Sequence, residues 1–172
     1  MDRASRIWAS EAGGGALLDL AVYPFTWTLL ALGSPATWTA DAVVLPDVGV
    51  DVLTTLSLAY PGTAVAQRTC TPLSQAVHTG TMAGEDATLS TWAPLTNPTG
   101  GTIEVSEGVR EVRADPTGPP HAFMLHEVTR CVQEGLLESS AMPLDLTLAT
   151  IRMFDDVRRR IGVRCPNDAR VR

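Results

Sequence analysis

Cysteine is scarce in this sequence, and lysine is missing altogether. The three cysteines, Cys70, Cys131 and Cys165, form neither a Cys-x-x-Cys pair nor a cysteine–histidine spacing typical of a zinc site. An odd number of cysteines without such spacing argues against a disulfide framework and favours a reducing compartment. We therefore expect a cytoplasmic protein with neither structural disulfides nor bound zinc.

The motifs of several large enzyme classes are also missing. There is no Gly-x-Ser-x-Gly elbow, Walker loop or His-Glu-x-x-His sequence, and His78, His121 and His126 lack metal-ligand spacing, so no metal site is expected. Gly13–Gly15 does not match a dinucleotide fingerprint, because Leu18 stands where the third glycine belongs and no strand precedes it. These glycines either cradle an anion at a helix N-terminus or serve a sharp turn, and we favour the turn. We therefore expect this chain alone to bind no cofactor.

Positive charge is in short supply, and arginine carries all of it. The 13 cationic residues are outnumbered by 19 acidic ones, which leaves a net charge of −6 and a pI near 4.9. Nucleic-acid binding depends on clustered cationic charge, so no nucleic-acid partner is expected. From Arg152 to Arg172, however, seven arginines stand against three aspartates. This end either complements the dipole of a solvated helix, which we favour, or binds an anion or a partner.

Long apolar runs are limited to one stretch, Ala16–Leu32, in which Asp19 is the only charged residue. The stretch is shorter than the roughly 20 residues that span a bilayer, and it contains Pro24, so neither a membrane span nor a signal peptide is expected. It predicts instead a single buried helix that begins after Gly13–Gly15 and ends at Gly33.

Asp19 and Tyr23 are four residues apart, so they project from one face of the predicted helix as neighbours. Removing a hydride from a secondary alcohol requires a base for the hydroxyl proton. A tyrosine ordinarily titrates at about pH 10 and needs a cationic or hydrogen-bonding neighbour to act at neutral pH, and this stretch contains no such neighbour. Alternatively, Asp19 bonds to the glycine turn or to backbone freed by Pro24 while Tyr23 fills the core, and the spacing alone favours this structural role.

The rest of the chain alternates short strand patterns with turn signals. Hydrophobic content of 45% and charged content of 19% predict one globular domain over residues 1–172. In residues 51–60, Val52, Thr54, Leu56 and Leu58 alternate with a second set that begins at Asp51, as in a strand with one better-buried face. The predicted strands are 38–44, 51–60, 63–71, 75–81, 87–92, 102–105 and 109–113. Helical spacing returns at 123–135 and again from a cap at Asp145 to Gly162. This order predicts an α+β fold, a mostly antiparallel open sheet with helices on one face.

Two blocks of the sequence resemble one enzyme family. The run GGGALLDLAVYPFTWTLLALG, from Gly13 to Gly33, resembles the segment GGG-x-L-x-D-x-G-x-(H/Y) with a later glycine. That segment opens the substrate-domain core of the glucose-fructose oxidoreductase, inositol dehydrogenase and MocA (Gfo/Idh/MocA) family, and the run looks most like its dihydrodiol dehydrogenase-like members. The block from Glu127 to Asp145 is similar to the EVxRC, G, ES and MPLD elements near that family's C-terminus. The resemblance covers nearly the whole chain in the right order.

The resemblance implies a single C-terminal substrate and oligomerisation domain over residues 1–172, without the N-terminal nucleotide-binding domain. The whole enzyme would use NAD or NADP to oxidise or reduce a sugar, a polyol or a cyclic diol. Tyr23 would then be the acid/base and Asp19 would orient Tyr23 or the substrate. The absent domain would bring the nicotinamide and a catalytic lysine, which this chain cannot supply. The chain alone would be inactive, and it would form a homo-oligomer through the exposed face of its sheet.

The sequence departs from the family pattern at two positions. Ala21 stands where a glycine is usual, and Met124 stands where the second helix commonly carries an acid. These departures bear on the identity of the substrate more than on the fold. The alternative to an enzyme domain is a truncated, non-catalytic binding or interaction module derived from such an enzyme.

Overall fold

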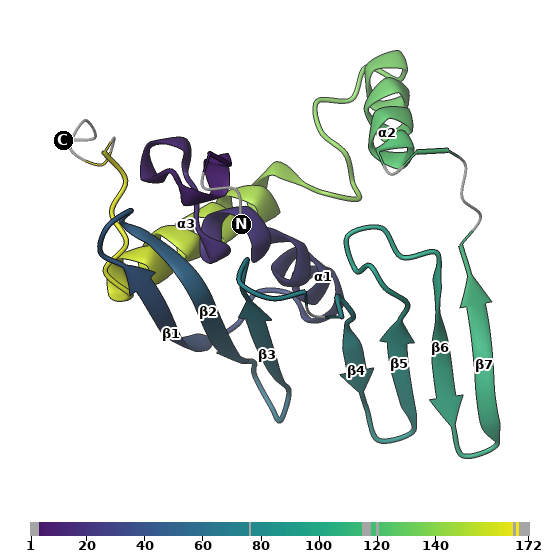
Figure 1. Ribbon diagram of the computed structural model, residues 1–172. Helices are drawn as coiled ribbons and strands as arrows, with labels where there is room; N and C mark the ends of the chain where they lie inside the picture. The colour runs from purple at the N-terminus through teal and green to yellow at the C-terminus, as the bar shows by residue number, and fades with distance from the viewer. Residues whose placement is uncertain (1–3, 76, 115–117, 120, 167, 169–172) are drawn as a thin grey trace. The chain divides into compact units, whose positions relative to one another are not determined.

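The chain forms two compact units, each with one antiparallel sheet and at least one helix (Figure 1). The computed structural model describes residues 4–75, 77–114, 118–119, 121–166 and 168. The first unit consists of Met1–Gln75 and Asp145–Arg172, and the second of Ala76–Leu144. The predicted α+β class with antiparallel strands is therefore confirmed, with the strands divided between two sheets.

The first unit combines short helical turns, two longer helices and a three-stranded sheet. Its elements are η1 (Arg6–Trp8), η2 (Ser10–Ala12), the π-helix η3 (Ala16–Leu20), α1 (Val22–Leu32), β1 (Thr37–Leu45), β2 (Val50–Ala59), β3 (Val65–Cys70) and α3 (Leu144–Arg160). The strands pair antiparallel in the order β1-β2-β3, close to the bounds predicted for residues 38–71.

The core of the first unit lies between its helices and one face of this sheet. Leu56 and Leu58 of β2 point into the same apolar cluster as residues of η3, α1 and α3. Within it, the rings of Phe25 (α1) and Phe154 (α3) lie with their centroids 5.2 Å apart. Leu17 of η3 is completely buried. Full burial of side chains of this size contributes roughly 2 kcal/mol each, so this cluster is the main source of stability of the unit.

The predicted helix Ala16–Leu32 has the right extent but is not continuous. Its first part is the π-helix η3, in which the N–H of Ala21 donates to the carbonyl of Ala16 at 2.9 Å, and α1 then begins at Val22. Pro24 has no N–H to donate to Leu20, so the helical hydrogen bonds are interrupted here.

In the described part of the chain, no single helix has both the length and the apolar character needed to cross a bilayer. Only Ser10–Leu20 and Val22–Leu32 taken together, bent by 45°, meet that condition of length and composition.

The second unit contains a four-stranded sheet and one helix. Its elements are β4 (Thr81–Ala83), β5 (Ala87–Thr91), β6 (Gly100–Val105), β7 (Gly108–Arg113) and α2 (Ala122–Gln133). The strands pair antiparallel in the order β4-β5-β6-β7. The prediction of a strand over residues 75–81 is wrong, since β4 begins only at Thr81. Residue 76 lies outside the described residues. Residues 77–80 do not show the alternating burial of a half-buried strand.

The helices of the second half end as the glycines predict, but the last one begins differently. Gly135 has a φ of 67° after α2, and Gly162 has a φ of 82° after α3. The prediction that Asp145 caps α3 is wrong, because the helix already begins at Leu144, whose N–H donates to Glu138 Oε2 at 2.7 Å. Asp145 lies inside the first turn, where a carboxylate still complements the helix dipole.

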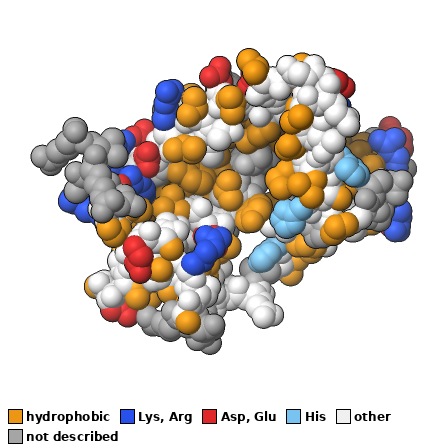
Figure 2. Space-filling view, turned by 90° about the horizontal axis from the view of Figure 1, so that it is seen from above, with side chains coloured by type: hydrophobic (Ala, Val, Ile, Leu, Met, Phe, Trp, Pro, Cys, Tyr) orange, Lys and Arg blue, Asp and Glu red, His pale blue; other side chains and the backbone are white. Residues whose placement is uncertain are grey.

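Apolar side chains remain exposed in the second unit. Figure 2, which colours side chains by type, shows many hydrophobic side chains at the surface of the chain. The exposed apolar residues on α2 and the turn after it are Phe123, Met124, Leu125, Val128, Val132, Leu136 and Leu137. Every residue of β7 is exposed as well. Among the described residues of this unit, only Ala122 and Cys131 are buried apolar side chains.

Candidate active site

Three glycines close the loop that leads into η3, and each has its own steric reason. Gly13 and Gly15 have φ values of 68° and 109°, which favour glycine. At Gly14, a Cβ would lie 2.6 Å from the carbonyl oxygens of both Arg6 and Ile7. Since the space beside the glycines is occupied by carbonyl oxygens, an anion would be repelled there. The favoured interpretation, a turn and not an anion site, is supported.

Asp51 of β2 closes the other side of this turn. Its carboxylate is fully buried, and its Oδ2 accepts hydrogen bonds from the N–H of Leu17 at 2.8 Å and from Thr54 Oγ1 at 2.5 Å. Its Oδ1 has no hydrogen-bond partner within the described chain, and a Cβ on Gly15 would collide with it. Asp51 therefore joins strand β2 to the beginning of η3.

A β-bulge in β2 brings Asp51 into this position. Val43 pairs with Leu53 but Val44 pairs with Asp51, so β2 has one extra residue at this point. Strict alternation would place Asp51 and Thr54 on opposite faces of the sheet, and the bulge places them on the same one. The expected alternation over residues 51–60 therefore holds from Val52 onward but is wrong at Asp51.

Asp19, the first of the two predicted site residues, lies in η3 and forms an ion pair with Arg6 of η1. The Asp19 side chain is 16% exposed and that of Arg6 is 67% exposed, so the pair lies at the rim of the first unit. A carboxylate held by a guanidinium keeps a fixed orientation and can still accept a hydrogen bond from a ligand. π-Helical turns such as η3 occur frequently at functional sites.

Tyr23, the second predicted residue, lies in the first turn of α1 and is 49% exposed. In the structure as described, no hydrogen bond joins Tyr23 to Asp19. The break at Ala21 separates the two residues, so the i, i+4 neighbourhood of a continuous helix does not apply between them. The alternative, in which Asp19 bonds to the glycine turn or to backbone freed by Pro24 and Tyr23 fills the core, does not match the structure. Asp19 pairs with Arg6, and Tyr23 is half exposed. Their catalytic roles stay a prediction.

Arg68 of β3 places a cation beside the first turn of α1, where the sequence suggested none. Its Nε donates to the carbonyl of Pro24 at 3.1 Å, and its guanidinium lies 5.9 Å from the ring centroid of Trp27. Burial lowers the pKa of Arg68 from its usual value, and the nearby Tyr60 phenol partly offsets this effect. The sequence gives little sign of this contact, because the pairing of β3 with β2 is what brings Arg68 to α1.

Comparison with known proteins identifies the family. Residues 1–90, more than half of the chain, match the sequence model of the GFO/IDH/MocA C-terminal domain. The chain belongs to this family. Its sequence is 31% identical over 160 residues to trans-1,2-dihydrobenzene-1,2-diol dehydrogenase of Danio rerio, covering 88% of this chain and 47% of that protein. The Homo sapiens enzyme of the same name is 27% identical over 166 residues, covering 91% and 49%.

Solved structures show the same GFO/IDH/MocA fold. An aldose-aldose oxidoreductase from Caulobacter crescentus, complexed with glycerol, aligns with a TM-score of 0.76 at 17% identity, covering 94% of this chain and 50% of that one. A 3-ketoreductase from Actinomadura kijaniata, in complex with NADP and TDP-benzene, aligns with a TM-score of 0.74 at 22% identity, covering 92% and 50%. The chain spans about half the length of the curated relatives it matches.

The second block of the GFO/IDH/MocA resemblance forms a polar network at the end of α2. Arg130 binds both carboxylate oxygens of Glu127, at 2.8 and 2.9 Å, and also contacts Glu134 at 2.6 Å. Ser139 donates to Glu127 Oε1 at 2.5 Å, and Cys131 is buried beside it. The hydrogen bonds from Arg130 and Ser139 lower the pKa of Glu127 to about 2. These residues hold α2 to the turn that follows it, which is a structural role.

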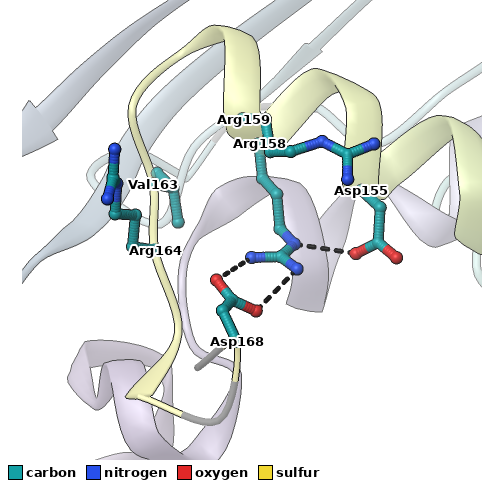
Figure 3. Close-up of a pocket in the computed structure, with 6 residues that line it drawn as sticks. All are labelled: Asp155, Arg158, Arg159, Val163, Arg164 and Asp168. Atoms are coloured by element: carbon teal, nitrogen blue, oxygen red, sulfur yellow. Dashed lines mark hydrogen bonds and ion pairs between the residues drawn. The ribbon is translucent and has the colours of Figure 1, made fainter. Parts of the chain in front are cut away.

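The arginine-rich C-terminal part of the chain lines a hollow of about 500 Å³ (Figure 3). Arg158 reaches from α3 to Asp168, with its two terminal nitrogens 2.5 and 2.7 Å from the carboxylate, and its Nε donates to Asp155 at 2.8 Å. Arg159 pairs with Asp156. Since aspartates of the same chain already bind these arginines, the structural interpretation is favoured over an anion site. Arg170 and Arg172 lie outside the described residues.

An apolar hollow of about 230 Å³ lies between α1 and α3 beside Trp38. Neither this hollow nor the arginine-lined one includes Asp19 or Tyr23. Among the described residues, no group of three or more histidine, cysteine, aspartate or glutamate side chains is placed to hold a metal ion.

Arg6 and Asp51 are the site residues that sequence reasoning missed. Arg6 lies in a separate turn from Asp19, and their pairing depends on the path of the glycine loop. Asp51 reads as an ordinary strand residue because a bulge leaves no local signal. The one hint in the sequence is that Asp51 is the only charged residue of β2, since charge is seldom buried without a partner.

Proposed function

We propose that this chain is the substrate-binding and oligomerisation part of an NAD(P)-dependent oxidoreductase that acts on a sugar, a polyol or a cyclic diol. The single observation that carries the proposal is a half-exposed tyrosine, Tyr23, that follows an aspartate held by an arginine, Asp19 with Arg6. Asp19 and Tyr23 lie in the Gly13–Gly33 motif, and all three residues lie within residues 1–90, which match the family model. The names of its relatives, a dihydrodiol dehydrogenase and an aldose-aldose oxidoreductase, support the substrate class.

In this proposal the phenolate form of Tyr23 accepts the hydroxyl proton of the substrate alcohol and becomes a phenol. The carbon that bears the hydroxyl loses a hydride, which leaves a carbonyl. Asp19, held by Arg6, accepts a hydrogen bond from a neighbouring substrate hydroxyl and so orients the diol. Bound nicotinamide supplies the hydride acceptor in enzymes of this kind. The glycine turn does not fit a dinucleotide, because the carbonyls of Arg6 and Ile7 and the carboxylate of Asp51 crowd it. We accordingly propose that the chain alone is inactive and binds neither NAD nor NADP.

A chimeric enzyme tests the proposal. The half of the Danio rerio dehydrogenase that this chain does not match would be joined to residues 1–172, and oxidation of trans-1,2-dihydrobenzene-1,2-diol would be followed with NADP. We expect turnover that falls about 100-fold or more in Tyr23→Phe, the range typical of a lost general base. Tyr60→Phe is the matched control, since Tyr60 is buried in the core and its hydroxyl lacks a hydrogen bond in the described structure. Equal activity of both variants would refute the assignment of Tyr23.

Cofactor binding by the chain alone is the simplest complementary measurement. Titration of the 172-residue chain with NADH and NADPH, followed by nicotinamide fluorescence, should show no saturable binding up to millimolar concentration. Saturable micromolar binding would mean that the chain contains a nucleotide site of its own, and the division of labour proposed above would be wrong.

A second candidate function, a non-catalytic interaction module, is favoured by the exposed apolar surface of the second unit. Extensive exposed apolar patches usually mark contact surfaces. Light scattering should then give a dimer or a larger assembly, while the chimera described above stays inactive. A homo-oligomer formed through the sheet is part of both candidates, and a clean monomer would count against both.

A further inference from the structure

We infer that Asp51 is a positioning residue that holds Asp19 and Arg6 in their relative places, an inference that rests on the function proposed above. Asp51 touches neither Asp19 nor Tyr23 through any hydrogen bond in the described structure. It acts through the backbone, because its Oδ2 binds the N–H of Leu17, two residues before Asp19 in the same π-helical turn.

The glycine loop is held from two sides, and Asp51 is one of them. On one side the N–H of Gly15 donates to the carbonyl of Ile7 at 2.8 Å, and the carbonyl of Arg6 is packed against Gly14. On the other side the Asp51 carboxylate lies against Gly15 and binds Leu17. Arg6 and Asp19 therefore meet across a loop whose far end is fixed to strand β2 by this carboxylate and by the packing of Ala16 and Leu17 in the apolar cluster.

The details of the Asp51 environment favour a dedicated role over incidental burial. The carboxylate is completely buried, yet its Oδ1 finds no partner among the described residues, an arrangement that costs stability. A bulge is required to turn it inward, and Thr54 orients it with a second hydrogen bond to Oδ2. A charged acceptor binds a backbone N–H more strongly than a neutral one, which explains why a carboxylate serves here.

The experiment compares three variants of the 172-residue chain. Asp51→Asn keeps the shape of the side chain and removes its charge. Thr54→Val removes only the hydrogen bond that orients the carboxylate. Leu58→Ala is the control for stability alone, since Leu58 lies buried in the same strand and belongs to the central apolar cluster.

Two quantities would be measured for each variant, below its unfolding midpoint. The first is amide hydrogen exchange over Leu17–Ala21, relative to the paired amides of β2 and β3. The second is the set of chemical-shift changes at Asp19 and Tyr23 when trans-1,2-cyclohexanediol is added. Asp51→Asn should raise exchange over Leu17–Ala21 about tenfold relative to the sheet, as expected for a lost hydrogen bond to a charged group. It should also remove the diol-induced shifts, and Thr54→Val should do both to a smaller degree.

Leu58→Ala should lower the unfolding midpoint yet keep the relative protection of Leu17–Ala21 and the diol-induced shifts. Loss of those shifts in Leu58→Ala as well would overturn the inference, because general destabilisation would then suffice. Unchanged exchange and unchanged shifts in Asp51→Asn would also overturn it. If the unmodified chain shows no diol-induced shift, the proposed function fails. In that case the hydrogen exchange over Leu17–Ala21, compared between Asp51→Asn and Leu58→Ala, is enough to decide whether Asp51 positions the π-helical turn.

Discussion

The two units of this chain differ in what holds them together. In the first, Met1–Gln75 with Asp145–Arg172, helices η3, α1 and α3 bury a continuous apolar cluster against one face of a sheet. In the second, Ala76–Leu144, α2 exposes most of its apolar side chains, and β7 is exposed along its whole length. Its best-defined interactions are polar, centred on the Glu127 carboxylate. Hydrophobic burial therefore stabilises the first unit, whereas much of the apolar surface of the second unit stays exposed.

The largest expected effect comes from matched phenylalanines, one in each unit. Phe25→Ala should lower the free energy of unfolding by about 3–5 kcal/mol, because Phe25 is 1% exposed and packs on Phe154. Phe123→Ala should cost about 0.5 kcal/mol or less, since Phe123 is 51% exposed. Urea unfolding followed by circular dichroism measures both. Similar losses would mean that α2 is covered in solution, and the contrast between the units would disappear.

Glycine substitutions sharpen the description of the first unit. Gly15→Ala should cost about 2–3 kcal/mol, because Gly15 has a φ of 109° and a Cβ there would strike the Asp51 carboxylate. Gly13→Ala is the control, since it has a φ of 68° but nothing within 4 Å of the added Cβ, and should cost about 1 kcal/mol. Thermal unfolding distinguishes them. If the two variants were equally stable, contact between Asp51 and the turn would be unimportant.

The polar network makes the second unit sensitive to acid. Its hydrogen bonds hold the pKa of Glu127 at about 2, below the usual value of a glutamate. A carboxylate whose pKa is lowered on folding contributes stability above its unfolded pKa of about 4.3, and this is lost as the pH falls toward the folded value. Acid titration followed by helical circular dichroism should show this loss.

Glu127→Gln tests the assignment of that acid sensitivity. It should be less stable than the unmodified chain at pH 7 and should show a flatter pH dependence in the acid range. Glu134→Gln, which leaves the paired contacts between Arg130 and Glu127 in place, is the control and should keep most of the pH dependence. An unchanged acid profile in Glu127→Gln would place the sensitivity elsewhere.

The smallest effect concerns the reactivity of two equally buried thiols. Cys70 and Cys131 are each 7% exposed, in the first and second unit respectively. The pKa of the Cys70 thiol is raised to about 11, mainly by burial and also by the nearby Asp51 carboxylate, while Arg68 opposes this rise. Burial also raises the pKa of Cys131, helped by its hydrogen bond to Glu127. Neither thiol should react readily at neutral pH, because the thiolate is the nucleophile.

Mild denaturant should separate the two thiols. Cys131 is expected to be labelled by iodoacetamide before Cys70, since local opening of α2 exposes fewer apolar contacts than opening of the first unit. Glu127→Gln should speed labelling of Cys131 and leave Cys70 unchanged. Simultaneous labelling of both would show that the units unfold together.

Much of the fold could be predicted from the sequence, because local signals coincide with the actual ends of elements. Alternation in residues 51–60 and the glycines after α2 and α3 placed their elements closely. The strand predicted over 75–81 failed because its residues carry no such alternation. The prediction of one continuous helix over Ala16–Leu32 was wrong for a different reason, since apolar periodicity does not reveal a π-helical turn.

The candidate site was predictable only in part. Motif and spacing selected Asp19 and Tyr23, and both lie at the rim of the first unit. The sequence could not show that Arg6 binds Asp19 or that Arg68 approaches α1, because each contact joins segments that are brought together by the path of the chain.

Most of the secondary structure and the family could be predicted from the sequence alone, since both depend on local composition and order. Only the tertiary structure decided where the charges lie. A single extra residue in β2 turned Asp51 into the core, and a loop of three glycines carried Arg6 to Asp19. Side-chain direction in a strand depends on register, and register is set by pairing with distant residues. Contacts of this kind appear only once the chain has folded.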